Sequence, residues 1–197
     1  NASVKGARSV VTKQSPQEEK VIPIAQVRFD SGEIDAAVAV LRSGNVRQGK
    51  VTRELEERFA AMMTANARQL GMNGTTFRNA SGLPDEAQRT TAYDMAILSM
   101  ALRKRFPHHY HFFNNREFSH AGKVVRGHNN LLGRVDGVDG LKTGYIRASG
   151  FNLATSVGRG GRRIVAVVMG GDSAKARDAH MMELIEHYMP RAGAAGS

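Results

Sequence analysis

A Lys-Thr-Gly triplet, Lys142-Thr143-Gly144, lies within the stretch 138–146, which has the composition of a β-strand. Glycine in a strand lets the backbone of a bound molecule approach closely. A threonine hydroxyl can bind a carboxylate, and a lysine supplies a positive field beside a nucleophile. The triplet therefore predicts a strand that binds an anionic group, with Lys142, Thr143 and Gly144 as candidate catalytic or binding residues.

A second pattern, between Gly44 and Lys50, nearly matches a phosphate-binding loop. Gly44, Gly49 and Lys50 stand at the G-x-x-x-x-G-K positions, but Val51 occupies the place where Ser or Thr would hold Mg²⁺. A predicted helix, rather than an apolar strand, precedes Gly44. The sequence therefore favours an ordinary loop here, and we expect no cofactor.

Three histidines, His108, His109 and His111, follow a predicted helix end at Pro107. A metal site would need further Asp, Glu or His ligands at i, i+4 spacing on a regular element. The pattern favours a surface loop whose imidazoles lie near a helix C-terminus. We therefore predict no metal site.

The composition is basic, and this charge limits the kinds of molecule that the protein is expected to bind. The 197 residues carry a formal net charge of +10 and no cysteine. Such a charge favours anionic polymers, nucleic acid or carboxylate ligands. The basic residues are scattered and only 6% of residues are aromatic, which argues against nucleic acid. No run of about 18 consecutive apolar residues occurs, so we predict no membrane span.

Helices are predicted where apolar residues recur at three- and four-residue spacing. Ser31 is a candidate N-terminal cap of the first helix. Thr91, with Asp94 three residues on, predicts the start of the third. Gly71 predicts the end of the second. The predicted helices are 33–42, 52–70, 91–106 and 174–188; the second has an apolar stripe of Leu55, Phe59, Met62, Met63 and Leu70, and the third a buried face of Met95, Leu98, Leu102 and Phe106.

Strands are predicted in the second half of the chain. Residues 116–128 indicate a hairpin turning at 121–123, and 138–146 a strand carrying the triplet. Residues 151–157 and 162–170 flank a glycine-rich turn and predict the strongest hairpin. Helices followed by antiparallel strands and a closing helix are typical of an α+β or mixed α/β fold, with a helix on an antiparallel sheet.

Five collinear stretches carry a resemblance to a known family: LGMNGTTFRNASGLPD, TTAYDMAILSMAL, NREFSH, GHNNLLGRVDGVDGLKTGYIRASGFNLATS and VAVVMGGDSAKARDAHMMELIEHY. From about Glu57 to Pro190, the chain closely resembles the serine D-alanyl-D-alanine carboxypeptidases, the low-molecular-mass penicillin-binding proteins. The resemblance implies part of a penicilloyl-serine transferase (β-lactamase-like) domain, with an antiparallel sheet flanked by helices. It also implies removal of the terminal D-Ala from peptidoglycan stem peptides through an acyl-enzyme, and acylation by β-lactams.

The family has three motifs, S-x-x-K, S-x-N and K-T-G. Lys142, Thr143 and Gly144 match the third residue by residue. Arg177 matches an arginine that the family places near the substrate carboxylate. Ser43 and Asn45 fit S-x-N at about the usual interval, although the flanking sequence differs from the family's. By the same comparison, His128 and Asn129 are interpreted as structural.

The first motif is absent from these 197 residues, since no lysine follows a Ser or Thr by three positions. A serine needs a nearby base to act as a nucleophile. Hydrolysis by this chain is therefore expected to be absent or very weak, because the members of a nucleophilic unit act together.

Residues 22–61 carry a different resemblance. The stretch IPIAQVRFDSGEIDAAVAVLRSGNVRQGKVTRELEERFAA resembles the opening of the pyridoxal-phosphate-dependent sugar aminotransferases, without their cofactor lysine. The two resemblances meet at about Glu54 to Met62, which indicates a junction that a natural fusion, an engineered chimera or a mis-assembled sequence would each produce. The predicted organisation is a disordered arm (1–20), a helical appendage (21–56), the carboxypeptidase-like part (57–190) and a frayed tail (191–197).

Three hypotheses follow. The first is an extracytoplasmic enzyme-family protein, located in the periplasm by resemblance although the sequence shows no signal peptide, whose partner is a peptidoglycan stem peptide or a β-lactam. The second is a non-catalytic protein that binds D-Ala-D-Ala ends, or a chimeric structural protein. The third is that segment 22–61 mediates homo-oligomerisation.

Overall fold

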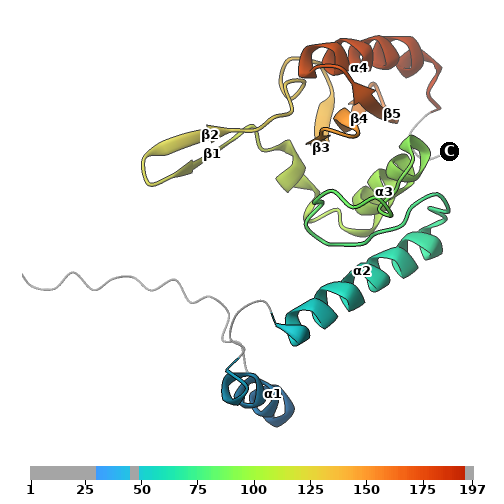
Figure 1. The fold of residues 1–197 in the computed structure, drawn as a ribbon. Coiled ribbons are helices and arrows are strands. Elements are labelled where there is room, and N and C mark those ends of the chain that lie inside the picture. Colours follow the sequence, from blue (N-terminus) through green and yellow to red (C-terminus); the bar gives the residue numbers. More distant parts are fainter. Residues whose placement is uncertain (1–29, 45–48, 194–197) are drawn as a thin grey trace, which may run out of the picture. The chain divides into compact units, whose positions relative to one another are not determined.

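The structure of the chain, a computed structural model, describes residues 30–44 and 49–193 (Figure 1). The chain forms two compact units, Asn1–Arg47 and Gln48–Ser197. The predicted arm at 1–20 lies outside the described residues, as do the last four residues of the predicted tail. The predicted junction at 54–62 stays a prediction.

The described part of the first unit is helix α1 (Ser31–Arg42). Its N-terminal cap is Asp30, whose Oδ1 accepts a hydrogen bond from the Glu33 backbone N–H at 2.8 Å. The Glu33 carboxylate accepts from the Asp30 N–H at 2.9 Å, which completes a capping box. The predicted cap at Ser31 was therefore wrong by one residue, because Asp30 has the Glu three positions on that the reciprocal bonds require.

The second unit is built around a three-stranded antiparallel sheet in the order β3-β4-β5, with a separate two-stranded hairpin. The predicted strand 138–146 and helix 174–188 are confirmed. At the tip of the β4–β5 hairpin, Gly160 and Gly161 both have positive φ, a conformation that glycine adopts without strain. The elements are α2 (Lys50–Leu70), α3 (Ala92–Arg105), η1 (Tyr110–Asn114), β1 (Glu117–His120), β2 (Lys123–Arg126), β3 (Val138–Ile146), β4 (Gly150–Arg159), β5 (Arg162–Gly171), α4 (Ala174–Tyr188) and η2 (Met189–Arg191).

Helix α4 packs on one face of the sheet and forms the apolar core with it. Leu153 and Val157 are four positions apart on β4 and therefore point to the same face of the sheet. On this face they meet Met181 and Ile185 of α4, which are fully buried. The segment before β3 closes the core with Leu131 and Leu132, and η2 adds Met189. The position of β3 is therefore fixed by apolar burial on the α4 side.

Helix α3 contacts β4 and β5 on the face opposite α4 (Figure 1), and this face combines apolar positions such as Ala154 and Val165 with the polar Ser156 and Arg163. The predicted N-terminal cap is confirmed, since Thr91 Oγ1 accepts from the Asp94 N–H at 3.0 Å. The buried Asp94 carboxylate accepts from the Thr75 hydroxyl at 2.6 Å, and Thr75 also bonds Thr90 at 2.9 Å. These bonds hold the irregular segment after α2 against the start of α3.

Two predicted apolar faces differ from the structure. On α2, Leu55, Phe59 and Met62 are 65%, 49% and 62% exposed, while the buried residues are Ala60 and Ala67. Met63 and Leu70 of the predicted stripe are half-buried, so the buried side of α2 consists of the two alanines and only part of that stripe. On α3, the predicted Phe106 is also exposed, because it is the C-terminal cap and has left the helix.

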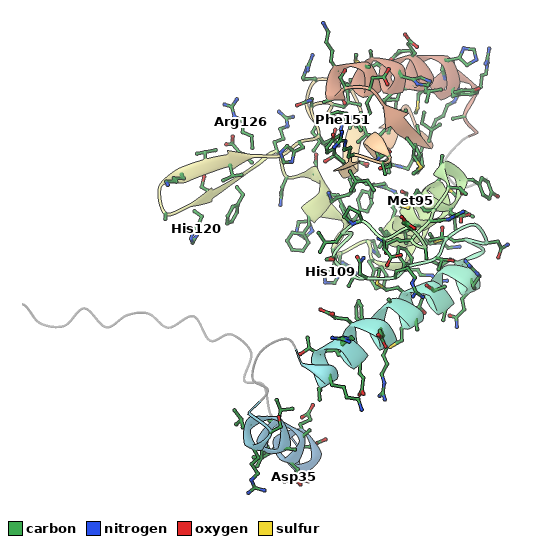
Figure 2. All side chains as sticks on the ribbon, in the orientation of Figure 1. Asp35, Met95, His109, His120, Arg126 and Phe151 are labelled. Atoms are coloured by element: carbon green, nitrogen blue, oxygen red, sulfur yellow. The ribbon has the colours of Figure 1, made fainter. Side chains whose placement is uncertain are left out.

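The β1–β2 hairpin projects from the unit and is exposed over all eight positions (Figure 2). Its register, Glu117↔Arg126 to His120↔Lys123, confirms the predicted turn. Within the described part of the chain, no helix combines the length and apolar character needed to cross a bilayer.

Candidate functional site

Strand β3 lies at one edge of the sheet and carries the triplet. It pairs with β4 alone, so its other edge is open within the described part of the chain. Lys142 and Gly144 are exposed, whereas Thr143 lies directly opposite Leu153 of the α4-facing core. Directly opposed residues of an antiparallel pair point to the same face. Thr143 therefore faces the side of the sheet that α4 covers.

The structure brings Lys142, Thr143, Gly144 and Arg177 together around one cavity of about 490 Å³. They come from two elements, β3 and the first turns of α4. The segment just after the β1–β2 hairpin adds a third wall to this cavity. Together, the remaining lining residues are Gly127, His128, Asn130, Tyr145, Phe151 and Ala174.

Arg177 is held rigidly at the base of this cavity, and only 3% of it is exposed. Its Nε and Nη2 donate to Asp178 Oδ1 at 2.9 and 2.6 Å, and its Nη1 reaches the Asn152 carbonyl at 3.4 Å. Asp178 Oδ2 accepts from Asn130 Nδ2 at 2.8 Å. A guanidinium has five N–H donors, so Nη1 and Nη2 each keep one for a ligand.

A glycine allows Arg177 to sit this close to the sheet. A Cβ on Gly171 would lie 3.0 Å from the Arg177 Cβ and 3.2 Å from the Phe151 carbonyl oxygen. Two residues on, the Ser173 hydroxyl accepts from the Ala176 N–H at 3.0 Å and begins α4. The Gly-Gly-Asp-Ser sequence thus places the start of α4 against the end of β5.

The other two polar side chains of the triplet differ in their bonding. Lys142 Nζ donates to the Thr143 carbonyl. The Thr143 hydroxyl makes no hydrogen bond with any residue in the described ranges. It is therefore available to a ligand in the cavity that Arg177 also lines.

Of the two residues interpreted as structural, His128 and Asn129, the structure gives each a different place. Asn129 accepts from the Leu131 N–H at 3.2 Å, as a structural residue would, although its Nδ2 is buried without a partner among the residues that the structure describes. His128, in contrast, is exposed and lines the cavity. The sequence analysis did not identify Asn130 as a site residue. The sequence signal that could have found it is the neighbouring apolar pair Leu131-Leu132, which anchors this segment in the core.

Ser43 and Asn45 stay predictions. Ser43 is the C-terminal cap of α1, where its N–H donates to the Ala39 carbonyl at 3.0 Å and its hydroxyl to the Val40 carbonyl at 2.7 Å. Ser43 belongs to the first unit, and Asn45 lies outside the described residues.

A polar network lies on the α3 face of β3, directly before the triplet. Asp139 accepts from Arg103 at 3.1 Å, from Arg163 at 2.5 Å and from the Tyr110 hydroxyl at 3.2 Å. Burial raises the pKa of the Tyr110 phenol, and the charge of Asp139 raises it further. Arg163 also donates to Ser156 at 2.8 Å. The network fixes the backbone that leads into Lys142.

Comparison with known proteins identifies a common family. Residues 33–173 match the peptidase S11 family, described as D-alanyl-D-alanine carboxypeptidase. A relative, D-alanyl-D-alanine carboxypeptidase DacD of Escherichia coli strain K12, is 38% identical over 131 residues, which are 66% of this chain and 34% of the relative. The chain thus spans about a third of that relative's length.

Solved structures agree with this family and with the predicted fold class. Penicillin binding protein 6B from Escherichia coli has a TM-score of 0.62 at 38% identity, covering 66% of this chain and 42% of that chain. Penicillin-binding protein D2 from Listeria monocytogenes, in the ampicillin-bound form, has a TM-score of 0.60 at 31% identity, covering 65% and 54%. The predicted resemblance and fold class are confirmed, while the resemblance of 22–61 to aminotransferases stays a prediction.

Proposed function

The chain belongs to the D-alanyl-D-alanine carboxypeptidase family, and we propose that its triplet cavity binds the terminal carboxylate of peptides that end in D-Ala-D-Ala. The observation that carries the proposal is the convergence of Lys142, Thr143 and Arg177 on one cavity of about 490 Å³. Two cations and one unengaged hydroxyl suit a carboxylate, because charge-assisted hydrogen bonds are the strong ones.

Each residue has a distinct proposed role. Thr143 and Arg177 donate hydrogen bonds to the carboxylate, and Lys142 supplies a positive field. Gly144 lets the peptide backbone approach the strand. The open edge of β3 offers backbone groups to an extended peptide, as in recognition by strand addition. A β-lactam, which carries a carboxylate next to its reactive amide, fits the same groups.

Turnover requires a nucleophile, and these 197 residues contain no S-x-x-K. We propose Ser43 and Asn45 as the S-x-N pair, which helps to transfer protons in the family but does not replace the first motif. The proposed activity of this chain is therefore binding, with acyl-enzyme turnover absent or very weak. Such a chain is a non-catalytic protein that binds D-Ala-D-Ala ends of the cell wall. The other candidate function is that of a carboxypeptidase that trims these ends.

The proposed partner is the peptidoglycan stem peptide, and the proposed location is outside the cytoplasmic membrane, where that polymer lies. The formal net charge of +10 is compatible with an anionic polymer. Penicillin-binding protein D2 from Listeria monocytogenes has been solved in an ampicillin-bound form, which supports a β-lactam as a second ligand of this chain. Homo-oligomerisation through segment 22–61 remains a separate proposal.

The test compares N-acetyl-D-Ala-D-Ala with its C-terminal amide by calorimetric titration of the full chain. The free carboxylate should bind more tightly. Thr143→Val should reduce that preference about tenfold, because hydrogen bonds to charged groups are worth about 1.5–3 kcal/mol. Thr52→Val, an exposed change on α2, is the matched control. Equal affinity for acid and amide would contradict the proposal.

Intact-protein mass spectrometry after incubation with penicillin separates binding from acylation. An unshifted mass together with carboxylate binding supports the non-catalytic reading. A stable adduct would overturn it, and peptide mapping of that adduct would identify the serine.

A further inference from the structure

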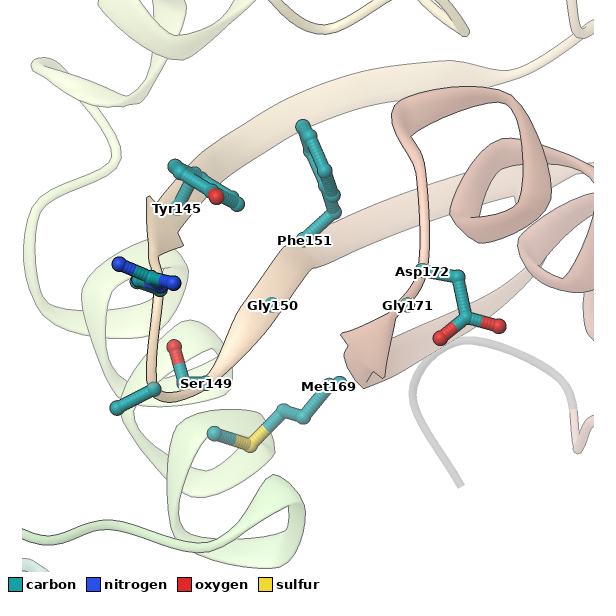
Figure 3. Close-up of a pocket in the computed structure, with 10 residues that line it drawn as sticks. Tyr145, Ser149, Gly150, Phe151, Met169, Gly171 and Asp172 are labelled. Carbon is teal, nitrogen blue, oxygen red and sulfur yellow. The ribbon is translucent and has the colours of Figure 1, made fainter.

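The cavities of this protein differ in the charges that border them. A cavity of about 610 Å³, which adjoins the triplet cavity, has both signs, since Arg147 and Asp172 line it (Figure 3). Another cavity, of about 320 Å³, lies between the last turns of α3 and the first residues of β5. The charged residues that line this α3–β5 cavity are all positive, and the proposed function uses none of them.

The α3–β5 cavity has an excess of positive charge. Its six lining residues include the cations Arg103, Lys104 and Arg163 and no acidic residue. Within the described ranges, the carboxylate that bonds these cations is that of Asp139, which the two arginines share at 3.1 and 2.5 Å. Three positive charges against one negative charge leave two uncompensated. The remaining lining residues are Met100, Ile164 and Val165.

The two guanidinium groups are held in place before any ligand arrives. Arg103 donates to Asp139 through Nη1 and lies over the Tyr110 ring, 5.0 Å from its centroid. Arg163 donates through Nη1 to Asp139 and to Ser156. A guanidinium has five N–H donors. Neither arginine makes a hydrogen bond through Nε or Nη2 with any residue that the structure describes, so these donors are left for a ligand.

Lys104 adds a third cation that no other group engages. It is exposed, and it makes no hydrogen bond or ion pair within residues 30–44 and 49–193. Because it lies in the last turn of α3, its charge also interacts favourably with the negative end of the helix dipole. That effect needs neither a cavity nor an anion, so the two roles can be separated by experiment.

The arrangement suits a phosphate group attached to an apolar body. The planar fork of an arginine matches the geometry of phosphate oxygens, and hydrogen bonds between ionised groups are the strong ones. A phosphate monoester is a dianion, which complements the two uncompensated charges. Val165 lies directly opposite Ser156 on the α3 side of the sheet, and Met100 of α3 lines the same cavity. These two side chains offer apolar contact to the organic part of an ester.

We propose that the α3–β5 cavity binds the phosphate group of a phosphomonoester. Arg103 and Arg163 donate hydrogen bonds to the phosphate oxygens, and Lys104 supplies the third positive charge. Met100 and Val165 contact the group that the phosphate esterifies. This site is separate from the triplet cavity, and the proposal does not depend on the proposed function.

The experiment titrates the full chain with phenyl phosphate and with methyl phenyl phosphate by calorimetry at pH 8. Phenyl phosphate is a dianion at this pH, because the second pKa of a phosphomonoester is about 6. The methyl ester has the same aromatic ring and one negative charge. Phenyl phosphate should bind at least about threefold more tightly, because it gains a further ion pair. Equal affinity, or no binding by either compound, would overturn the proposal.

Lys104→Gln tests the site without disturbing the Asp139 network. It should weaken phenyl phosphate about threefold to fivefold, the range for a solvent-accessible ion pair. Arg105→Gln, a neighbouring exposed charge outside the cavity, is the matched control and should keep the native affinity. A Lys104→Gln variant with a lower melting temperature and an unchanged affinity would overturn the proposal, since that result indicates a role on the helix dipole alone.

Two further titrations locate the phosphate and its source. Lys142→Gln should leave the affinity for phenyl phosphate unchanged, and loss of binding in this variant would overturn the proposal by assigning the phosphate to the triplet cavity. Inorganic phosphate and dihexanoyl phosphatidate carry the same group without an ester and on a short lipid. Binding of either compound that weakens in Lys104→Gln supports the site, and the tighter of the two indicates a free phosphate or a lipid headgroup as its source.

Discussion

The two faces of the β3-β4-β5 sheet differ in how much polar bonding accompanies their apolar packing. On the α4 face, Val157, Met181 and Ile185 are completely buried in apolar contacts. On the α3 face, Asp139 gathers two arginines and a buried tyrosine. Apolar burial is strong but non-directional, whereas hydrogen bonds fix orientation. The comparison indicates that the α4 face sets the stability of the sheet and the α3 face sets the conformation of the strand before the triplet.

The ion pair at the start of α4 is buried, and breaking it should have the largest effect. Asp178→Ala leaves the Arg177 charge buried without its partner. The free energy of unfolding should fall by about 3–5 kcal/mol. Urea unfolding followed by circular dichroism at 222 nm measures this, since the chain has no tryptophan.

Replacing both members of the pair is the control. Arg177→Met with Asp178→Leu should recover most of the stability, because apolar residues of similar volume tolerate burial. The double variant should still lose carboxylate binding. A double variant as unstable as Asp178→Ala would show that packing, and not the unpaired charge, causes the loss.

Truncation in the apolar core comes next. Ile185 is fully buried between α4 and the sheet. Ile185→Ala should lower the free energy of unfolding by about 3 kcal/mol, from lost burial and the cavity that remains. The same measurement on Ile34→Ala, an exposed residue of α1, should show a change of less than about 0.5 kcal/mol. Equal losses would contradict the assignment of the core.

A substitution in the Asp139 network should lower the free energy of unfolding less than the truncation of Ile185. Asp139→Asn removes the charge that Arg103 and Arg163 share, and it leaves these partly exposed arginines to water. We expect a loss of about 1–2 kcal/mol, because partial exposure screens the interaction. If the network orients the triplet, the free energy of carboxylate binding should change by more than the free energy of unfolding. A variant with native peptide affinity would refute that orienting role.

The smallest expected effect is a pH dependence from Tyr110. Burial raises the pKa of its phenol above the ordinary value of 10.0. Above about pH 10 the unfolded chain therefore loses this proton while the folded chain retains it, so stability falls as the pH rises from there through the raised pKa. Urea unfolding between pH 9 and pH 11 should show this decline, and Tyr110→Phe should show less of it. Identical slopes would contradict a buried phenol.

The sequence located most regular elements because their signals are local. Glycine pairs and alternating apolar residues marked β4 and β5, and Thr91 with Asp94 marked the start of α3. The predicted apolar stripe of α2 was right only in part, since Met63 and Leu70 are half-buried while Leu55, Phe59 and Met62 are exposed. Periodicity identifies an amphipathic helix, but it does not say which face finds a partner.

The candidate site was predicted only in part. Lys142, Thr143, Gly144 and Arg177 were identified from the family motifs, and the structure places them around one cavity. Asn130 was missed, because a single asparagine has no local signature in the sequence.

By itself, the sequence determined the family, the boundaries of β3 and α4, and the identity of the triplet, all of which depend on neighbouring residues in the chain. Only the tertiary structure decided that Asn130 donates to Asp178, and that Arg147 and Asp172 border one cavity. These relations join residues far apart in the chain. They exist because α4 packs on the sheet through apolar burial, which specifies where elements meet but leaves no pattern in the polar residues brought together.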